Sequence, residues 1–148
     1  MKLDINKIKQ ICKENKIGFI LGYSKGIKKN STMPVLFESE KDLVSMVFNG
    51  FCNHNLITYL LKAIEKNTKQ KKSTKIGVFA KPCDAKSIVE LIRENKINRE
   101  DLFIFLLSCS GVINSKKVDA LKERETECLT DVENKNGSAI LKFENRTV

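Results

Sequence analysis

The chain has 148 residues, of which 41% are hydrophobic and 30% charged, a size and composition that fit one compact domain with a buried core. Its net charge of +9 comes almost wholly from lysine, with 23 lysines against 4 arginines and no tryptophan. This composition argues against a nucleic-acid binder, which relies on arginine and stacking aromatic rings, and the lack of any long apolar run argues against a membrane span.

The N-terminal part of the chain predicts a helix followed by a hairpin. Asp4 is placed to cap the helix, and the apolar face of that helix carries Cys12 as a core residue. Apolar runs at 17–23 and 33–37 predict two strands, and the polar, glycine-containing segment between them predicts the hairpin loop.

Two helices are predicted next. Residues 39–42 resemble a capping box ahead of a short helix that runs to about Phe48. A second helix starts at about Asn55 and gives way to the polar run 66–74, which we expect to be an exposed, lysine-rich loop.

The centre of the chain predicts a strand–helix–strand unit. Residues 76–80 and 103–107 are apolar runs, and residues 85–94 between them have the apolar spacing of an amphipathic helix. Such a connection joins parallel strands, so both strands must end at the same edge of the sheet. A further helix over 115–125 and a second hairpin at residues 128–143, with Asn-Gly at its turn, are expected to follow.

Together these elements predict a single α/β domain over residues 1–148. Its mixed sheet contains the parallel strand–helix–strand core, is flanked by helices, and has antiparallel hairpins at the N- and C-terminal ends.

Two cysteines follow the two central strands. Parallel neighbouring strands would bring Cys83 and Cys109 to one edge, where open α/β sheets bind ligands and where two thiolates can share a metal or a cluster. Asp84 is expected to cap the helix at this point, and the helix N-terminus favours the thiolate form of Cys83. The alternative is that both cysteines are small buried residues at strand ends.

A third cysteine stands beside the one histidine of the chain. Cys52 and His54 lie in the break between two predicted helices, but a single pair at this spacing is a weak zinc signal. His54 is more simply a capping or surface residue. Phosphate binding is hinted at by residues 108–111 and 84–87, although no glycine fingerprint of a nucleotide site is present.

Four segments between Phe48 and Lys117 carry a family resemblance. They are Phe48-Asn49-Gly50-Phe51-Cys52-Asn53-His54-Asn55-Leu56, Lys81-Pro82-Cys83-Asp84-Ala85-Lys86-Ser87-Ile88-Val89-Glu90-Leu91-Ile92, Ile97-Asn98-Arg99-Glu100-Asp101-Leu102 and Cys109-Ser110-Gly111. These segments resemble the beta subunits of deazaflavin-dependent (coenzyme F-420) hydrogenases and formate dehydrogenases.

The resemblance implies an electron-transfer or oxidoreductase module. It implies that Cys52, Cys83 and Cys109 ligate an iron–sulfur cluster, that Asp84 and Gly111 shape the cofactor-edge loops, and that FAD is a further cofactor. The partners that it implies, together with the net positive charge, are an acidic redox protein or other oxidoreductase subunits, and a homo-oligomer stays open. Enzyme activity, if there is any, would be that of an oxidoreductase subunit.

The chain also departs from the family pattern. It has no Cys-x-x-Cys-x-x-Cys ferredoxin run, and within residues 122–131 only Cys128 stands where the family has a cysteine pair. The alternative is therefore a cofactor-free family member that acts as a structural or protein-interaction domain.

A cytoplasmic location is expected, because the first seven residues alternate charged and apolar instead of opening a signal region. In a reducing compartment, five cysteines are more typical of buried thiols, metal ligands or redox groups than of disulfides.

Overall fold

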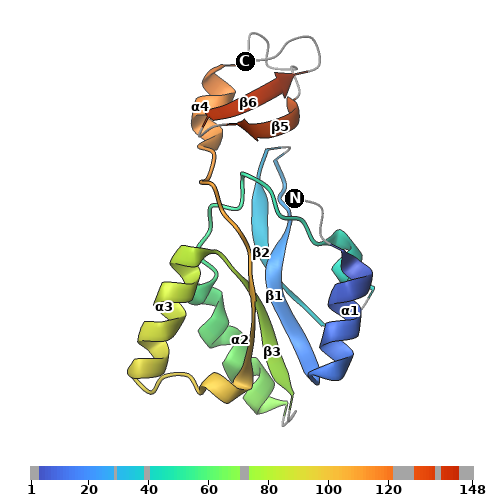
Figure 1. Cartoon of the computed structure of the whole chain (residues 1–148), viewed down its shortest axis with the longest axis vertical. Coiled ribbons are helices and arrows are strands. Elements are labelled where there is room, and N and C mark those ends of the chain that lie inside the picture. The colour runs from blue at the N-terminus through green and yellow to red at the C-terminus, as the bar shows by residue number, and fades with distance from the viewer. Residues whose placement is uncertain are drawn as a thin grey trace.

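The computed structural model describes residues 4–28, 30–38, 41–70, 74–121, 129–135 and 138–143. Its main feature is a four-stranded mixed sheet in the order β2-β1-β3-β4 (Figure 1). The strands of this sheet are β1 (Ile17–Lys25), β2 (Thr32–Phe37), β3 (Lys75–Ala80) and β4 (Leu102–Leu106). β1 and β2 form an antiparallel hairpin, whereas β1, β3 and β4 run parallel. The predicted fold class is confirmed.

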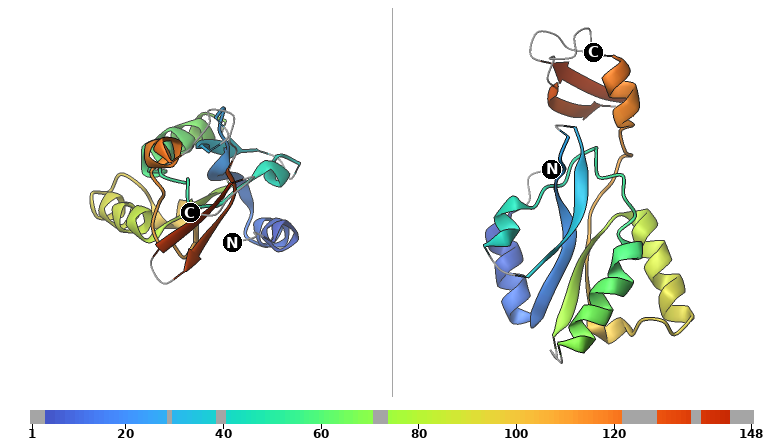
Figure 2. Two further views of the ribbon diagram at one scale, coloured as in Figure 1. Left: turned by 90° about the horizontal axis from the view of Figure 1, so that it is seen from above. Right: turned by 180° about the vertical axis from the view of Figure 1, so that it is seen from behind.

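Helices cover both faces of this sheet. α1 (Ile5–Glu14) lies on one face, and α2 (Ile57–Lys69) and α3 (Pro82–Arg93) lie on the other, as the view from above in Figure 2 shows. As predicted, the Asp4 side chain caps α1, because it accepts a hydrogen bond from the Lys7 amide at 3.2 Å. The helix expected from about Asn55 is α2, which starts at Ile57; the Asn55 side chain accepts a hydrogen bond from the Ile57 amide at 2.9 Å.

Successive side chains along each strand point to opposite faces of the sheet, so the core consists of two layers. Phe19, Leu21 and Tyr23 of β1 pack on the side of α2 and α3, whereas Ile20 packs with Ile8 of α1. β3 follows the same rule, with Ile76, Val78 and Ala80 toward α2 and α3 and Phe79 toward α1. Because both faces are covered, β1 and β3 are almost wholly apolar, as buried parallel strands are.

The structure corrects four expected boundaries. The helix expected to reach Phe48 is a single 3-10 turn, η1 (Asp42–Ser45). α2 continues to Lys69, so the start of the polar run 66–74 is helical, and residues 71–73 lie outside the described residues. α3 begins at Pro82, which places Asp84 at its third position and not at its cap. The fourth is the helix expected over residues 115–125, which the structure gives as α4 (Ser115–Ala120), with Asn114 as its N-terminal cap.

The C-terminal hairpin is confirmed as β5 (Leu129–Lys135) paired antiparallel with β6 (Ser138–Phe143). It forms a sheet of its own beyond one end of the main sheet (Figure 1). A second 3-10 turn, η2 (Arg99–Asp101), leads into β4. None of the helices in the described part of the chain is both long and apolar enough to cross a membrane.

Candidate functional site at the carboxyl edge of the sheet

β3 and β4 end side by side, and a cysteine follows each of them. Ala80 pairs with Leu106, and the Leu107 amide donates to the Ala80 carbonyl at 2.9 Å. Cys83 is the second residue of α3 and is exposed, whereas Cys109 is partly exposed in the segment after β4. The parallel arrangement therefore brings both residues to the carboxyl edge of the sheet, where ligands bind in open α/β folds.

Cys52 lies at the same edge, but its thiol is sealed. Only 1% of the residue is exposed, and its sulfur accepts a hydrogen bond from the Asn49 amide at 3.4 Å. Burial raises the pKa of the Cys52 thiol, an effect that the hydrogen bond from Asn49, a hydrogen bond with Thr32 and the charge of Lys81 only partly oppose. Cys52 is thus a buried, packed thiol, and its burial disfavours the thiolate form.

A buried lysine occupies the centre of this edge. Only 3% of Lys81 is exposed, and its ammonium donates to the Tyr23 hydroxyl at 2.6 Å, to the Cys52 carbonyl at 2.9 Å and to the His54 carbonyl at 2.8 Å. These three acceptors satisfy all three ammonium protons. Lys81 therefore ties the 52–54 turn to the end of β1 and to the start of α3.

Asp84 balances this buried charge. It is 1% exposed, and its carboxylate lies 3.5 Å from the Lys81 ammonium and accepts from the Lys81 amide at 3.1 Å. A buried carboxylate is tolerated when it is paired and hydrogen-bonded in this way. Asp84 therefore shapes the strand-to-helix turn through internal contacts.

The hydroxyl of Tyr23 lies in the same buried group of contacts as Lys81 and Asp84. It donates to the His54 carbonyl. Burial raises the pKa of Tyr23, and the charges of Asp84, Cys52, Cys83 and Cys109 raise the pKa further.

The segment after β4 is held against the turn that carries Cys52. The Ile113 amide donates to the Gly50 carbonyl at 2.7 Å, and a Cβ at Gly50 would lie 2.6 Å from Cδ1 of Ile113. A glycine at this position lets the two segments approach closely. Gly111 lies between Ile113 and Cys109, has φ +125, and has no atom within 4 Å of where its Cβ would lie.

The donor set fits an iron–sulfur cluster only in part. Such clusters take four cysteine thiolates, and Cys83 and Cys109, the accessible thiols that the described residues place at this edge, supply half of that number. Nowhere in the described ranges do three or more His, Cys, Asp or Glu residues form a group that could hold a metal ion. His54 is exposed and contributes its backbone carbonyl to the Lys81 contacts, and Cys128 lies outside the described residues.

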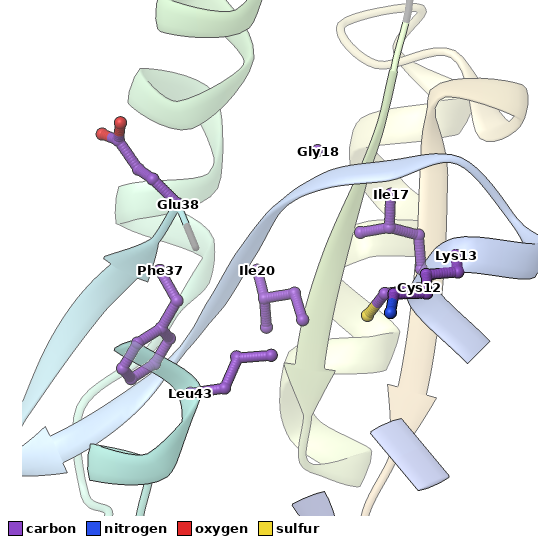
Figure 3. A pocket seen from close by; sticks show the side chains of 8 residues that line it. All are labelled: Cys12, Lys13, Ile17, Gly18, Ile20, Phe37, Glu38 and Leu43. Atoms are coloured by element: carbon purple, nitrogen blue, oxygen red, sulfur yellow. The ribbon is translucent and has the colours of Figure 1, made fainter. Parts of the chain in front are cut away.

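A pocket of about 130 Å³ lies at the opposite end of β1 (Figure 3). It is lined by Cys12 and Lys13 of α1, Ile17, Gly18 and Ile20 of β1, Phe37 of β2, Glu38 and Leu43. Most of these side chains are apolar, and none belongs to the carboxyl edge.

Sequence reasoning missed Tyr23 and the burial of Lys81. The available signals were a tyrosine in an otherwise apolar strand and a lysine between the last residue of β3 and the Pro-Cys-Asp segment. Neither signal reveals burial, because the acceptors for Lys81 come from residues 27 to 58 positions away.

Comparisons with known proteins relate the chain to oxidoreductase subunits. No family model matches the chain. It is 28% identical over 97 residues to the F420-dependent formate dehydrogenase 1 subunit beta of Methanococcus maripaludis. It is 32% identical over 95 residues to the F420-dependent formate dehydrogenase subunit beta of Methanocaldococcus jannaschii. These matches cover 66% and 64% of the chain but 24% of each relative, so the relationship to these beta subunits is partial.

A solved structure shares the fold. The chain superimposes on a chain of the F420-reducing nickel–iron hydrogenase complex from Methanosarcina barkeri with a TM-score of 0.72 and 16% identity. The superposition covers 98% of this chain and 52% of that one. The predicted resemblance to deazaflavin-dependent beta subunits is therefore confirmed as a partial relationship.

Proposed function

We propose that this chain is an electron-transfer module of an oxidoreductase complex and that Cys83 and Cys109 are ligands of an iron–sulfur cluster. The observation that carries the proposal is the pairing of Ala80 with Leu106, which brings one exposed and one partly exposed thiol to the same edge. The partial relationship to F420-dependent formate dehydrogenase beta subunits supports the class of reaction.

The edge suits thiolate ligands for two physical reasons. Cys83 stands exposed in the first turn of α3, so its sulfur is accessible to a cluster at the positive end of the helix dipole. Both cysteines follow strands that are fixed by the sheet ladder, and a rigid frame keeps ligands in place. A bound cluster would supply one-electron transfer at this edge.

The remaining ligands must come from elsewhere. Cys52 is the third proposed ligand, and its sulfur would have to leave its contacts in the 49–52 turn to join the other two. A fourth thiolate would come from Cys128 or from another subunit. The proposed cluster is therefore completed by a rearranged turn, by the C-terminal part of the chain or by a partner. FAD, and a role of Asp84 and Gly111 at its edge, stay predictions.

The proposed partners are other oxidoreductase subunits, including an acidic redox protein. A chain with a net charge of +9 attracts an acidic surface and steers its approach. The relatives are named as subunits, which supports partners of this kind.

A cofactor-free interaction domain is the second candidate. The Lys81 ammonium already occupies the space between Tyr23, Asp84 and the 52–54 turn, and every one of its protons has an acceptor. The buried polar groups at this edge therefore have hydrogen-bond partners within the chain and need no cofactor to supply them.

Anaerobic purification followed by analysis of iron, acid-labile sulfide and flavin distinguishes the two candidates. The first candidate predicts a coloured protein that contains iron and sulfide. A colourless protein without iron, which also fails to take up iron and sulfide on anaerobic reconstitution, would favour the second candidate and exclude the first.

A further inference from the structure

β4 is an edge strand, and the outward backbone groups of Ile104 and Leu106 have no partner among the described residues, whereas those of Leu102 are used by Arg99. The strand pairs with β3 alone among the strands of the described ranges. The Leu107 amide points to β3, since it donates to Ala80. Backbone amides alternate in direction along a strand, so the amide and carbonyl groups of Leu102, Ile104 and Leu106 point outward. Arg99 donates to the Leu102 carbonyl at 2.9 Å, in agreement with that direction.

The lateral edge of the sheet that β4 forms has few of the features that normally prevent strand pairing. In a chain with 23 lysines, the five residues of β4 include no charge and no proline, and their register with β3 is unbroken. The opposite edge of the sheet, β2, contains Pro34. Leu106 is 64% exposed, a large apolar surface for a residue at a sheet edge.

We propose that β4 pairs antiparallel with β4 of a second copy, about a two-fold axis at Ile104, and joins the two sheets into one. In this register the two Ile104 residues exchange two backbone hydrogen bonds, and Leu102 of each copy lies opposite Leu106 of the other. The outward amide and carbonyl of Ile104 then have partners, and the Leu106 amide can donate to the Leu102 carbonyl of the other copy, which also accepts from Arg99. An interface of this kind is self-complementary, which a two-fold dimer requires.

The side chains in this register match as well. Phe103 lies opposite Phe105 of the second copy, on the face that carries a stack of Phe105 on Phe79 with ring centroids 4.6 Å apart. Phe103 and Phe105 are half-buried in the single chain, and their ring centroids lie 4.9 Å apart. Pairing of two copies would extend this aromatic cluster across the seam.

Charge favours this register and selects the second copy as the occupant. The exposed acidic pair Glu100 and Asp101 precedes β4, and the antiparallel register brings it beside the carboxyl edge of the other copy. That edge carries the N-terminus of α3, the positive end of its dipole, and the exposed Lys86. The pairing therefore sets opposite charges at both ends of the seam, although each copy carries a net charge of +9.

Sedimentation equilibrium of the full chain over a wide concentration series tests the proposal. Salt should be moderate, so that the repulsion between the net charges is screened. The mass should rise from that of one chain, 16.8 kDa, toward twice that value. Hydrogen exchange should show protection of the Ile104 and Leu106 amides that increases with concentration. A protein that stays monomeric at every concentration would overturn the proposal.

Two variants and a control identify the interface. Leu106→Pro removes an outward amide without breaking a bond to β3, and Leu106→Lys adds the charge that edge strands normally use against pairing. Both variants should be monomeric, with unchanged circular dichroism for at least one of them. Val44→Lys makes the same change at a residue that is 69% exposed on η1 and should dimerise like the unmodified chain. A dimer that persists in a folded Leu106 variant would place the contact elsewhere and contradict the proposal.

Discussion

The Lys81 ammonium lies 2.6 Å from the hydroxyl oxygen of Tyr23, a residue 58 positions earlier in the chain. This contact joins the end of β1 to the start of α3, and the same ammonium binds the carbonyls of Cys52 and His54. Lys81 thereby fixes the relative positions of three segments at the edge where the cysteines lie.

Lys81→Met should destabilise the protein strongly. The variant leaves the buried Asp84 carboxylate without its ion pair, removes the donor to the buried Cys52 carbonyl and removes one of the two donors to the His54 carbonyl. Breaking one side of a buried pair costs about 3–5 kcal/mol in the free energy of unfolding. Urea denaturation measures this loss, with Lys86→Met on the exposed side of α3 as the matched control. Equal stability of the two variants would show that the buried contacts contribute little.

Tyr23→Phe should cost about 1–3 kcal/mol in the free energy of unfolding, because the Lys81 ammonium loses an acceptor and the His54 carbonyl a donor. Tyr59→Phe is the control, since Tyr59 is 38% exposed on α2. If Tyr23→Phe unfolds at the same urea concentration as Tyr59→Phe, the hydroxyl is not a structural contact.

The contribution of Tyr23 to the free energy of unfolding should also depend on pH. Burial raises the pKa of Tyr23 in the folded protein above its ordinary value of 10.0, so the unfolded chain loses this proton first. The stabilisation is therefore fully present below pH 10 and decreases as the pH rises above it. The stability difference between the unmodified chain and Tyr23→Phe should shrink over this range, when both are measured by urea denaturation at stepwise pH. A difference that grows with pH would contradict the assigned direction.

The cysteines should differ sharply in their rates of thiol labelling. Cys83 is exposed in the first turn of α3 and should react first, whereas Cys52 is sealed and its raised pKa further reduces its thiolate fraction. Time-resolved labelling with a disulfide reagent and peptide mapping measures both rates. Lys81→Met should speed the labelling of Cys52 by releasing the 52–54 turn, and Lys86→Met should not. Labelling of Cys52 as fast as Cys83 in the unmodified chain would mean that the turn does not seal the thiol.

The sequence was sufficient to predict the frame of this site. The apolar runs of β3 and β4 and the helical spacing between them define a parallel unit from local pattern alone, and this unit places Cys83 and Cys109. Residues 42–48 misled the prediction because a short apolar run satisfies both a helix and a single 3-10 turn.

The contacts inside the site could not be read from the sequence in the same way. A lysine after a strand is ordinarily a surface residue, and Lys81 is buried only because carbonyls from a distant turn converge on it. The direction of the Cys52 sulfur depends on the hydrogen bond from Asn49, which the residue order does not specify. Both features arise from long-range packing and not from local periodicity.

The iron content of anaerobically prepared cysteine variants tests the central claim most directly. Iron and acid-labile sulfide should be present in the unmodified chain and in Cys12→Ala, whose cysteine lies in α1 away from the edge, and absent from folded Cys83→Ala and Cys109→Ala. Equal iron in all four proteins, or none in any of them after anaerobic reconstitution, would contradict a cluster held by Cys83 and Cys109.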